Sequence, residues 1–169
     1  IVVMRFMDML MAIPSTLFAI CVVSALGTGV MNLLLAIMVS MIPQFAMIVR
    51  SSVLTIKGSE FIEAAQCGGT STARIIMRHI IPNAMGPIIV QATLALGGVI
   101  LTAASMSFIG LGVQPPEPEW GAILTEGQEF MRDYPYLVIF PGVTIMMAVL
   151  ACNFLGDGLR DALDPKLKQ

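Results

Sequence analysis

Uncharged apolar runs, separated by two polar connections, dominate the pattern of this chain. Residues 9–49 contain no Asp, Glu, Lys, Arg or His, whereas one helix needs only about 20 apolar residues to cross a bilayer core of roughly 30 Å. The run is therefore long enough for two helices. Gly27-Thr28-Gly29 is the natural break, because two glycines so close together end helices and open a turn. We predict spans near Met9 to Leu26 and Val30 to Val49.

Two more apolar runs follow later in the chain. One extends from Ile80 to Pro116 and the other from Tyr134 to Gly156, and each is long enough for one membrane-spanning helix. The polar connections between the runs cover residues 50–83 and 110–136. The pattern as a whole predicts an all-α, polytopic transmembrane helix bundle that forms a single domain. Its four predicted spans are residues 9–26, 30–49, 87–109 and 137–156.

Composition supports a membrane protein and excludes a soluble globular domain. Hydrophobic residues make up 57% of the 169 positions, only 12% are charged, and the mean hydropathy is +0.88, values far outside the soluble range. The chain begins at Ile1 in an apolar context, without an initiator Met or a basic flank followed by a cleavage site. We therefore expect that the true N-terminus of the protein is missing from this sequence.

The placement of Lys and Arg predicts which ends of the spans face the cytoplasm. Basic residues near span ends stay on the cytoplasmic side, and all but one fall before the first span, between the second and third, or after the fourth. The exception is Arg132, which shares its connection with five acidic residues. We predict that both chain ends and the connection 50–83 are cytoplasmic. The basic residues on that side are Arg5, Arg50, Lys57, Arg74, Arg78, Arg160, Lys166 and Lys168.

The predicted span interiors contain no ionisable Asp, Glu, Lys, Arg or His. A proton-coupled carrier usually needs an intramembrane carboxylate or histidine, and an intramembrane protease needs paired Asp or a Ser with a base, so the sequence argues against both classes. Neutral polar side chains in the spans either line a water-filled path or join helices through hydrogen bonds, and the sequence leaves both roles open. These residues are Ser24, Asn32, Ser40, Gln44, Gln91, Thr93, Thr102 and Asn153.

No cofactor, metal or catalytic site is predicted, and the protein is not expected to be an enzyme. Cys21, Cys67 and Cys152 are far apart and form no CxxC pair, which indicates free thiols. His79 is the single histidine and has no second metal ligand at helical spacing. The chain also lacks a GxxxxGK motif followed by Ser or Thr, so it contains no phosphate-binding loop of the usual kind.

The first polar connection contains a charged, glycine-broken stretch, EFIEAAQCGGTSTARIIMRHIIPNA, at residues 60–84. Ser59 is placed to cap a first helix, and Gly68-Gly69 to end it. Thr70 or Ser71 is placed to cap a second helix directly afterwards. A helix, a glycine turn and a second helix are therefore predicted between two spans.

Each of these short helices has a small or apolar side, and Pro82 is expected to break the helical register before the third span. Two short helices joined rigidly to two spans suit the transmission of force from a soluble partner. The alternative is a solvated loop that lies on the lipid headgroups. The residues expected to share a side are Phe61, Ala64 and Ala65 in the first helix, and Ile75, Ile76 and Ile80 in the second.

The stretch EAAQCGGTSTARIIMRHIIP resembles the EAA loop of permease subunits of ATP-binding-cassette (ABC) importers, in which Glu-Ala-Ala is followed by Gly after three residues and the loop ends in an apolar residue and Pro. The similarity extends along nearly the whole chain. MRFMDMLMAIPSTL, GLGVQPPEPEWGAIL and GDGLRDALDPKL resemble the C-type permease of dipeptide and oligopeptide importers, and RHIIPNA resembles the peptide and nickel branch. The matching loop positions are Glu63, Ala64, Ala65, Gly69, Ile81 and Pro82.

This resemblance implies a type I ABC-importer-like permease core in the plasma (inner) membrane, without two spans that family members have upstream. The EAA segment would be the coupling helix that docks in a groove of an ATP-binding subunit. The implied partners are a second permease subunit, two ATP-binding subunits, an extracytoplasmic solute-binding protein and the lipid bilayer, with no nucleic acid. The solute would be a dipeptide, an oligopeptide or nickel. A passive channel and a membrane scaffold without transport activity are the alternatives.

The outer connection also shows helical periodicity. Its apolar residues predict a short interfacial helix beneath an acidic surface. Such a helix anchors the chain at the outer interface, or else it meets a solute-binding protein or forms part of an outer gate. The residues concerned are Trp120, Ile123, Leu124, Phe130 and Met131.

Overall fold

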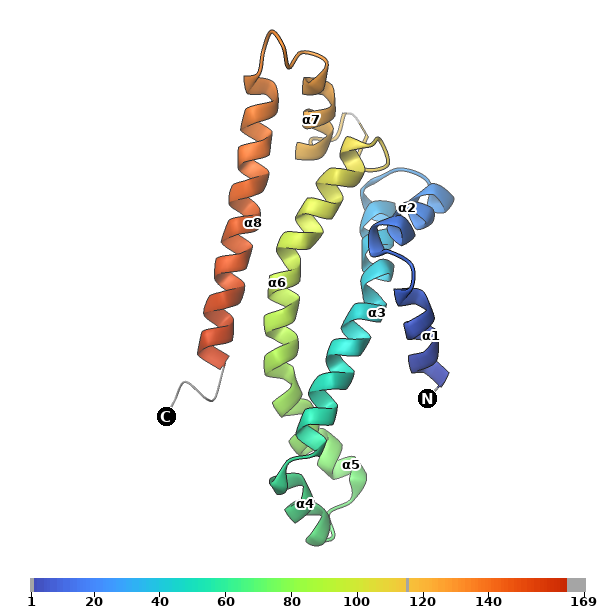
Figure 1. Ribbon diagram of the computed structural model, residues 1–169, viewed down its shortest axis with the longest axis vertical. Coiled ribbons are helices and arrows are strands. Elements are labelled where there is room, and N and C mark those ends of the chain that lie inside the picture. The colour runs from blue at the N-terminus through green and yellow to red at the C-terminus, as the bar shows by residue number, and fades with distance from the viewer. Residues whose placement is uncertain (1, 115, 164–169) are drawn as a thin grey trace.

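The computed structural model describes residues 2–114 and 116–163, and every regular element in that part of the chain is a helix. The all-α fold class predicted from the sequence is confirmed. The long helices run along the length of the molecule (Figure 1), with short helices toward its two ends and beside one of the long helices. In chain order the elements are α1 (Val2–Met11), α2 (Ser15–Leu26), α3 (Val30–Lys57), α4 (Glu60–Cys67), α5 (Thr72–Ile75), the π-helix η1 (Ile76–Ile80), α6 (Ile81–Phe108), α7 (Trp120–Gln128) and α8 (Tyr136–Leu163).

Part of the C-terminal tail lies outside the described residues. Lys166 and Lys168, which contribute to the predicted orientation, belong to that part, as does the end of the GDGLRDALDPKL stretch.

Three described stretches are long and apolar enough to cross a membrane, and each is longer than the span predicted for it. They are Val30–Lys57, Thr72–Phe108 and Tyr136–Leu163. The sequence pattern ends the second span at Val49, where charge begins. The helix α3 continues to Lys57 because residues 50–57 contain no Gly or Pro. A charged residue marks the edge of the hydrocarbon core, whereas a helix ends only where its backbone hydrogen bonding ends.

The first predicted span is not a single helix. Residues 12–14 separate α1 from α2, and the two helices are bent by 93° relative to each other. Pro14 has no backbone N–H, and its ring clashes with the turn before it, so α1 closes with i→i−3 hydrogen bonds and ends before the proline. The span predicted near Met9 to Leu26 is therefore interrupted at residues 12–14. The bent pair is nevertheless apolar enough to be a fourth candidate span.

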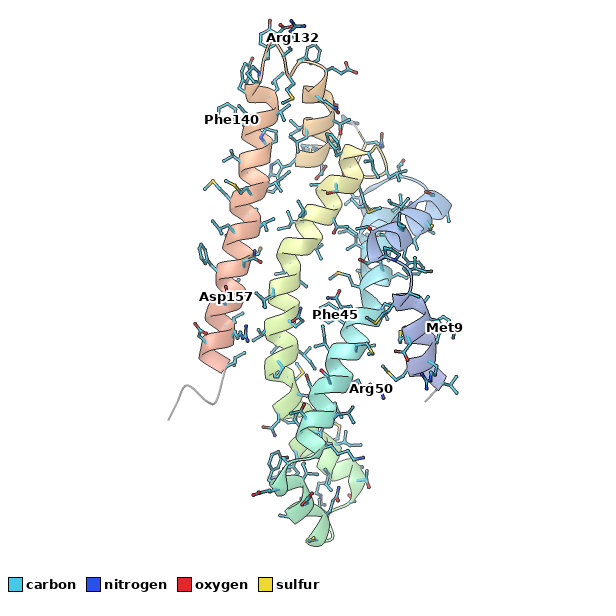
Figure 2. The ribbon with its side chains drawn as sticks, in the orientation of Figure 1. Met9, Phe45, Arg50, Arg132, Phe140 and Asp157 are labelled. Atoms are coloured by element: carbon cyan, nitrogen blue, oxygen red, sulfur yellow. The ribbon has the colours of Figure 1, made fainter. Side chains whose placement is uncertain are left out.

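The buried core is small, and many large apolar side chains are exposed. The main cluster joins α2, α3 and the C-terminal part of α6. On α8, by contrast, Phe140 and Phe154 are 68% and 67% exposed, and Figure 2 shows Phe140 pointing away from α6. Lipid tails are as apolar as Leu, so membrane helices do not have to bury such surfaces within one chain. The buried members of the cluster are Ala19, Val23, Leu33, Ala36, Ile37, Met106 and Val113.

α6 and α8 lie side by side and approach each other closely through glycines (Figure 1). A Cβ atom built on Gly97 would lie 3.1 Å from Asn153 Oδ1 and 3.2 Å from Val149 Cγ1. A Cβ atom on Gly156 of α8 would lie 2.5 Å from Leu94 Cδ2. Small residues allow helix backbones to approach in a membrane, where close packing replaces the hydrophobic effect as the driving force.

Candidate functional site: the helical hairpin between α3 and α6

The charged stretch of the sequence forms a helical hairpin, residues 58–80, at one end of the molecule. It consists of α4, a glycine turn, α5 and η1, and it connects the end of α3 to the start of α6. Figure 1 shows α4 and α5 at the opposite end of the molecule from α7. The hairpin is shorter than the predicted connection 50–83, because residues 50–57 belong to α3 and residues 81–83 belong to α6.

Ser59 and Ser71 occupy the predicted N-cap positions of α4 and α5, but neither side chain makes a capping hydrogen bond. The hydroxyl of Ser59 instead donates to the carbonyl of Ile56, at 2.5 Å. The last carbonyls of a helix have no partner within that helix, and α3 ends directly before Ser59. The side chain of Ser59 therefore caps α3, while its carbonyl accepts the first hydrogen bonds of α4, and the predicted side-chain caps are wrong.

The turn after α4 is a Schellman motif built on the two glycines. The N–H of Thr70 donates to the carbonyl of Ala65 at 3.1 Å, and that of Gly69 donates to the carbonyl of Gln66 at 3.0 Å. These two bonds satisfy carbonyls at the end of the helix. Gly69 has φ +73°, a left-handed conformation that costs other residues about 1–2 kcal/mol. The prediction that Gly68-Gly69 ends the first helix agrees with this geometry.

Three isoleucines join the two arms of the hairpin. Ile62 of α4 is fully buried, and Ile75 and Ile80 are 4% and 9% exposed. We call these three residues the isoleucine cluster. Val53 and Ile56 of α3 pack against it, so the cluster also ties α4 to the end of α3.

The π-helix η1 explains which isoleucines enter this cluster. Its i→i−5 hydrogen bonding widens the turn, which brings residues five apart, such as Ile75 and Ile80, onto a common side. Ile76 is 41% exposed. Of the three isoleucines predicted to form an apolar edge, only Ile75 and Ile80 are therefore buried. Ile62 was not singled out from the sequence. The signal for it was present, because it is the sole branched aliphatic residue in α4.

Pro82 does not break the helical register, contrary to the prediction. It lies in the first turn of α6, which continues directly from η1. In an α-helix Pro82 would leave the carbonyl of Arg78 without its N–H partner. Here the N–H of Ile81 already bonds to the carbonyl of Ile76, five residues earlier. The π-helix thus accommodates the proline without a break. As a result α5, η1 and α6 form one continuous helical stretch from Thr72 to Phe108.

The six positions that match the EAA loop fall into three places. Glu63 and Ala64 are exposed on the side of α4 away from the isoleucine cluster, whereas Ala65 is half-buried against the cluster. Gly69 lies in the turn. Ile81 and Pro82 are exposed at the start of α6.

One exposed face of α4 is thereby defined. Glu60, Glu63, Ala64 and Cys67 are all exposed, and their spacing places them on one side of a helix. We call them the outward face of α4. Of the two residues expected to share a side with Ala64, Ala65 packs against the isoleucine cluster, whereas Phe61 is 47% exposed.

Charge is divided between the arms of the hairpin. Glu60 and Glu63 lie in the first turn of α4, where carboxylates interact favourably with the helix dipole. The basic residues Arg74 and Arg78 lie on α5 and η1, and no ion pair joins the arms among the described residues. The ring of His79 lies 6.4 Å from that of Phe61, centroid to centroid. Within the same residues, no group of three His, Cys, Asp or Glu side chains could hold a metal ion.

A family model, the binding-protein-dependent transport system inner membrane component, matches residues 1–169. The chain belongs to this family. It is therefore a multi-pass inner-membrane protein, and the resemblance to permease subunits seen in the sequence is confirmed.

Curated members of the family are transport permeases and not enzymes. The dipeptide transport system permease protein DppC of Alkalihalophilus pseudofirmus is 49% identical over 164 residues, which cover 97% of this chain and 54% of the relative. The glutathione transport system permease proteins GsiD of Shigella flexneri and Escherichia coli are 48% identical over 166 residues, covering 98% of this chain and 55% of the relatives. The chain spans about half the length of the curated relatives it matches.

At the other end of this family member, α7 is packed against α6 and α8. The side chain of Glu119 caps α7, because it accepts a hydrogen bond from the N–H of Ala122 at 2.8 Å. Thr125 Oγ1 lies 3.0 Å from the carbonyl oxygens of both Phe108 and Gly121, so its single O–H is shared between the end of α6 and its own helix. The helix ends at Gln128. The prediction of helical spacing through Phe130 and Met131 is therefore wrong, and both lie exposed in the turn before α8.

The neutral polar residues of the predicted spans differ in what their side chains contact. Asn32 joins segments, because its Nδ2 donates to the carbonyls of Leu26 and Gly27 at 2.9 and 3.2 Å. Thr93 donates within its own helix, to Ile89. Four others line a single cavity between α3 and α6, namely Ser40, Gln44, Gln91 and Thr102.

Proposed function

We propose that this chain is part of the membrane-spanning permease subunit of an ABC importer for peptides or related solutes. The observation that carries the proposal is the hairpin at residues 58–80. It is a compact unit, anchored by buried isoleucines, and it continues without a break into one long apolar helix. A solvated loop on the headgroups would need neither a buried cluster nor a rigid junction.

The chain has no phosphate-binding loop of its own, so the energy of ATP is supplied by two cytoplasmic ATP-binding subunits. Closure of these subunits displaces the outward face of α4. The displacement passes through the isoleucine cluster to α3, and through η1 to α6. The two long helices then swing relative to α8 and a second permease subunit, and the path opens alternately to either side.

Each EAA position has a role in this mechanism. Ala64, small and exposed, lets the ATP-binding subunit approach the backbone of α4, and Glu63 gives that contact a polar anchor. Gly69 forms the turn that sets the direction of α4. Ala65 contributes to packing inside the hairpin rather than to docking, while Ile81 and Pro82 hold the junction with α6.

The orientation follows from the same proposal. The hairpin and both ends of the chain are cytoplasmic, and α7 faces an extracytoplasmic solute-binding protein. Dipeptides, oligopeptides, glutathione and nickel complexes are the candidate solutes, and nickel would be cargo rather than a bound structural ion. Relatives named for dipeptide and glutathione transport favour solutes that contain amide bonds.

Ala64→Arg tests docking, with Ala73→Arg as its control. Both alanines are exposed in the hairpin, but only Ala64 is on the outward face of α4. Ala64→Arg is expected to reduce co-purification of the full-length permease with its ATP-binding subunits by roughly tenfold or more, because a desolvated bulky cation disrupts a close contact. Membrane insertion should persist in both variants. Equal retention of the ATP-binding subunits by the two variants would refute the docking assignment.

Reconstitution separates transport from the alternatives. The full-length permease, its partner subunits and the binding protein are placed in liposomes, and solute uptake is measured with and without ATP. The proposal predicts uptake only with ATP. A passive channel would conduct without nucleotide, and a scaffold would bind its partners while no solute moved.

A further inference from the structure

A cavity of about 310 Å³ lies between α3 and α6, next to the start of α2. Its volume falls at the lower end of the range for small-molecule sites, about 300–1,000 Å³. Ser40 and Gln44 line it from α3, one helical turn apart, and Gln91 and Thr102 line it from α6, three turns apart. The cavity lining is therefore mixed, because apolar residues such as Leu94 and Val99 of α6 lie between these polar side chains.

The polar side chains around the cavity differ in their hydrogen bonding. The hydroxyls of Ser40 and Thr102 donate to carbonyls of their own helices, at 2.7 and 2.8 Å. Gln44 is exposed and Gln91 half-buried, and neither carboxamide makes a hydrogen bond to another described residue. Each carboxamide therefore retains one acceptor oxygen and two N–H donors for a ligand. An unpaired amide in an apolar helix is unfavourable unless water or a solute satisfies it.

The lining also limits which ligand chemistry fits. None of the described residues that line the cavity is ionisable, so it offers no opposite charge to a phosphate, a metal ion or a charged side chain. A carboxamide has the same donor and acceptor groups as a peptide bond and can pair with one through two hydrogen bonds. Such pairing is independent of the side chains of the solute.

We infer that Gln44 and Gln91 bind the peptide groups of the solute during its passage between α3 and α6. The inference rests on the proposed function, and it assigns to that function a solute site within the permease itself. The site recognises the amide group and not the side chains, so it suits a permease whose selectivity for side chains is supplied elsewhere.

Gly98 provides a way to block this cavity without disturbing the helices. It lines the cavity, and a Cβ atom built on it would meet no atom within 4 Å. Gly86, on the same helix, has equally open surroundings but does not line the cavity. Gly98→Leu and Gly86→Leu therefore form a matched pair.

The test uses the complete reconstituted transporter and two labelled probes, the dipeptide alanyl-alanine and its ester counterpart alanyl-lactate. The ester lacks the N–H of the peptide bond and is otherwise isosteric. ATP-driven uptake of both probes is measured for the wild type and for Gln44→Leu/Gln91→Leu. Any preference of the solute-binding protein affects both transporters equally, so it cancels in the ratio of ratios.

The double variant is expected to import alanyl-alanine about five- to tenfold more slowly, the factor that a hydrogen bond typically contributes, and to lose most of the peptide-over-ester preference. Gly98→Leu should slow both probes, whereas Gly86→Leu should not. Assembly with the partner subunits should be retained in every variant. A peptide-over-ester ratio unchanged from wild type would overturn the site while leaving the proposed function intact. Absence of ATP-driven uptake by the wild type of alanyl-alanine, of longer peptides and of glutathione would overturn both.

Discussion

Truncation of Ile62 to alanine removes the residue that holds α4 to the rest of the hairpin. Ile62 has no exposed surface and contacts the cluster formed with Ile75 and Ile80. The substitution deletes three carbon atoms, which at about 0.8 kcal/mol each gives a transfer loss of about 2.4 kcal/mol. A closed core would add a penalty for the cavity left behind, for a total of about 2–5 kcal/mol.

The surroundings of Ile62 place the expected value in the lower half of that range. Ile62 lines a cavity of about 480 Å³ beneath α4, so the vacated space joins an existing opening and does not become a closed void. We expect a local destabilisation of about 2–3 kcal/mol, which corresponds to a roughly 30- to 150-fold shift in the opening equilibrium of the hairpin.

Hydrogen exchange measures this shift directly. When reclosing is fast, the exchange rate of a protected amide follows its opening equilibrium. In the purified full-length permease in nanodiscs, Ile62→Ala should accelerate exchange in α4, and at the Thr70 N–H that bonds to Ala65, by about 30- to 150-fold. Met77→Ala is the control, because Met77 is 69% exposed in the same hairpin and should change exchange in α4 by less than about fivefold. Exchange within twofold of wild type in Ile62→Ala would refute the anchoring role.

Two glycine pairs provide further predictions. Gly69→Ala should destabilise the hairpin by about 1–2 kcal/mol, because the backbone of Gly69 is left-handed, even though a Cβ there would meet no atom within 4 Å. The control Gly58→Ala should be nearly neutral, because φ of Gly58 is −84°. Equal hydrogen exchange of the two variants would contradict this prediction. Gly121→Ala should destabilise α7 by about 1–3 kcal/mol, because the added Cβ would lie 2.7 Å from the Cα of Ala104 in α6. Gly142→Ala meets no atom within 4 Å and should stabilise α8 slightly. Thermal unfolding followed by the fluorescence of Trp120, the single tryptophan of the chain, measures the second pair, and an equal midpoint for both variants would count against close packing of α7.

The long helices and the hairpin were predictable because their signals are local. Uncharged runs define the apolar stretches, and the two glycines define the turn after α4. The bend between α1 and α2 was harder to predict, since Pro14 is compatible both with a kinked span and with a complete break. The extension of α3 to Lys57 was missed because charge was used to end the helix.

Contacts between elements were the part that the sequence could not supply. Whether Ala64 or Ala65 faces outward depends on how α4 is rotated against α3, and Ile62 decides that rotation through its burial. The π-turn at η1 depends on the junction between α5 and α6, so Pro82 alone predicted a break that is absent. The grouping of Gln44 with Gln91 likewise required the packing of two helices that are distant in the sequence.

The labelling of Cys67 by an impermeant thiol reagent tests the central claim most directly. Cys67 is exposed on the outward face of α4, and the other cysteines of the full-length protein are replaced by alanine for this measurement. A hairpin that receives force from cytoplasmic ATP-binding subunits predicts labelling in inside-out membrane vesicles, no labelling in intact cells, and protection when the ATP-binding subunits are bound. Labelling of Cys67 from the exterior of intact cells would contradict the account.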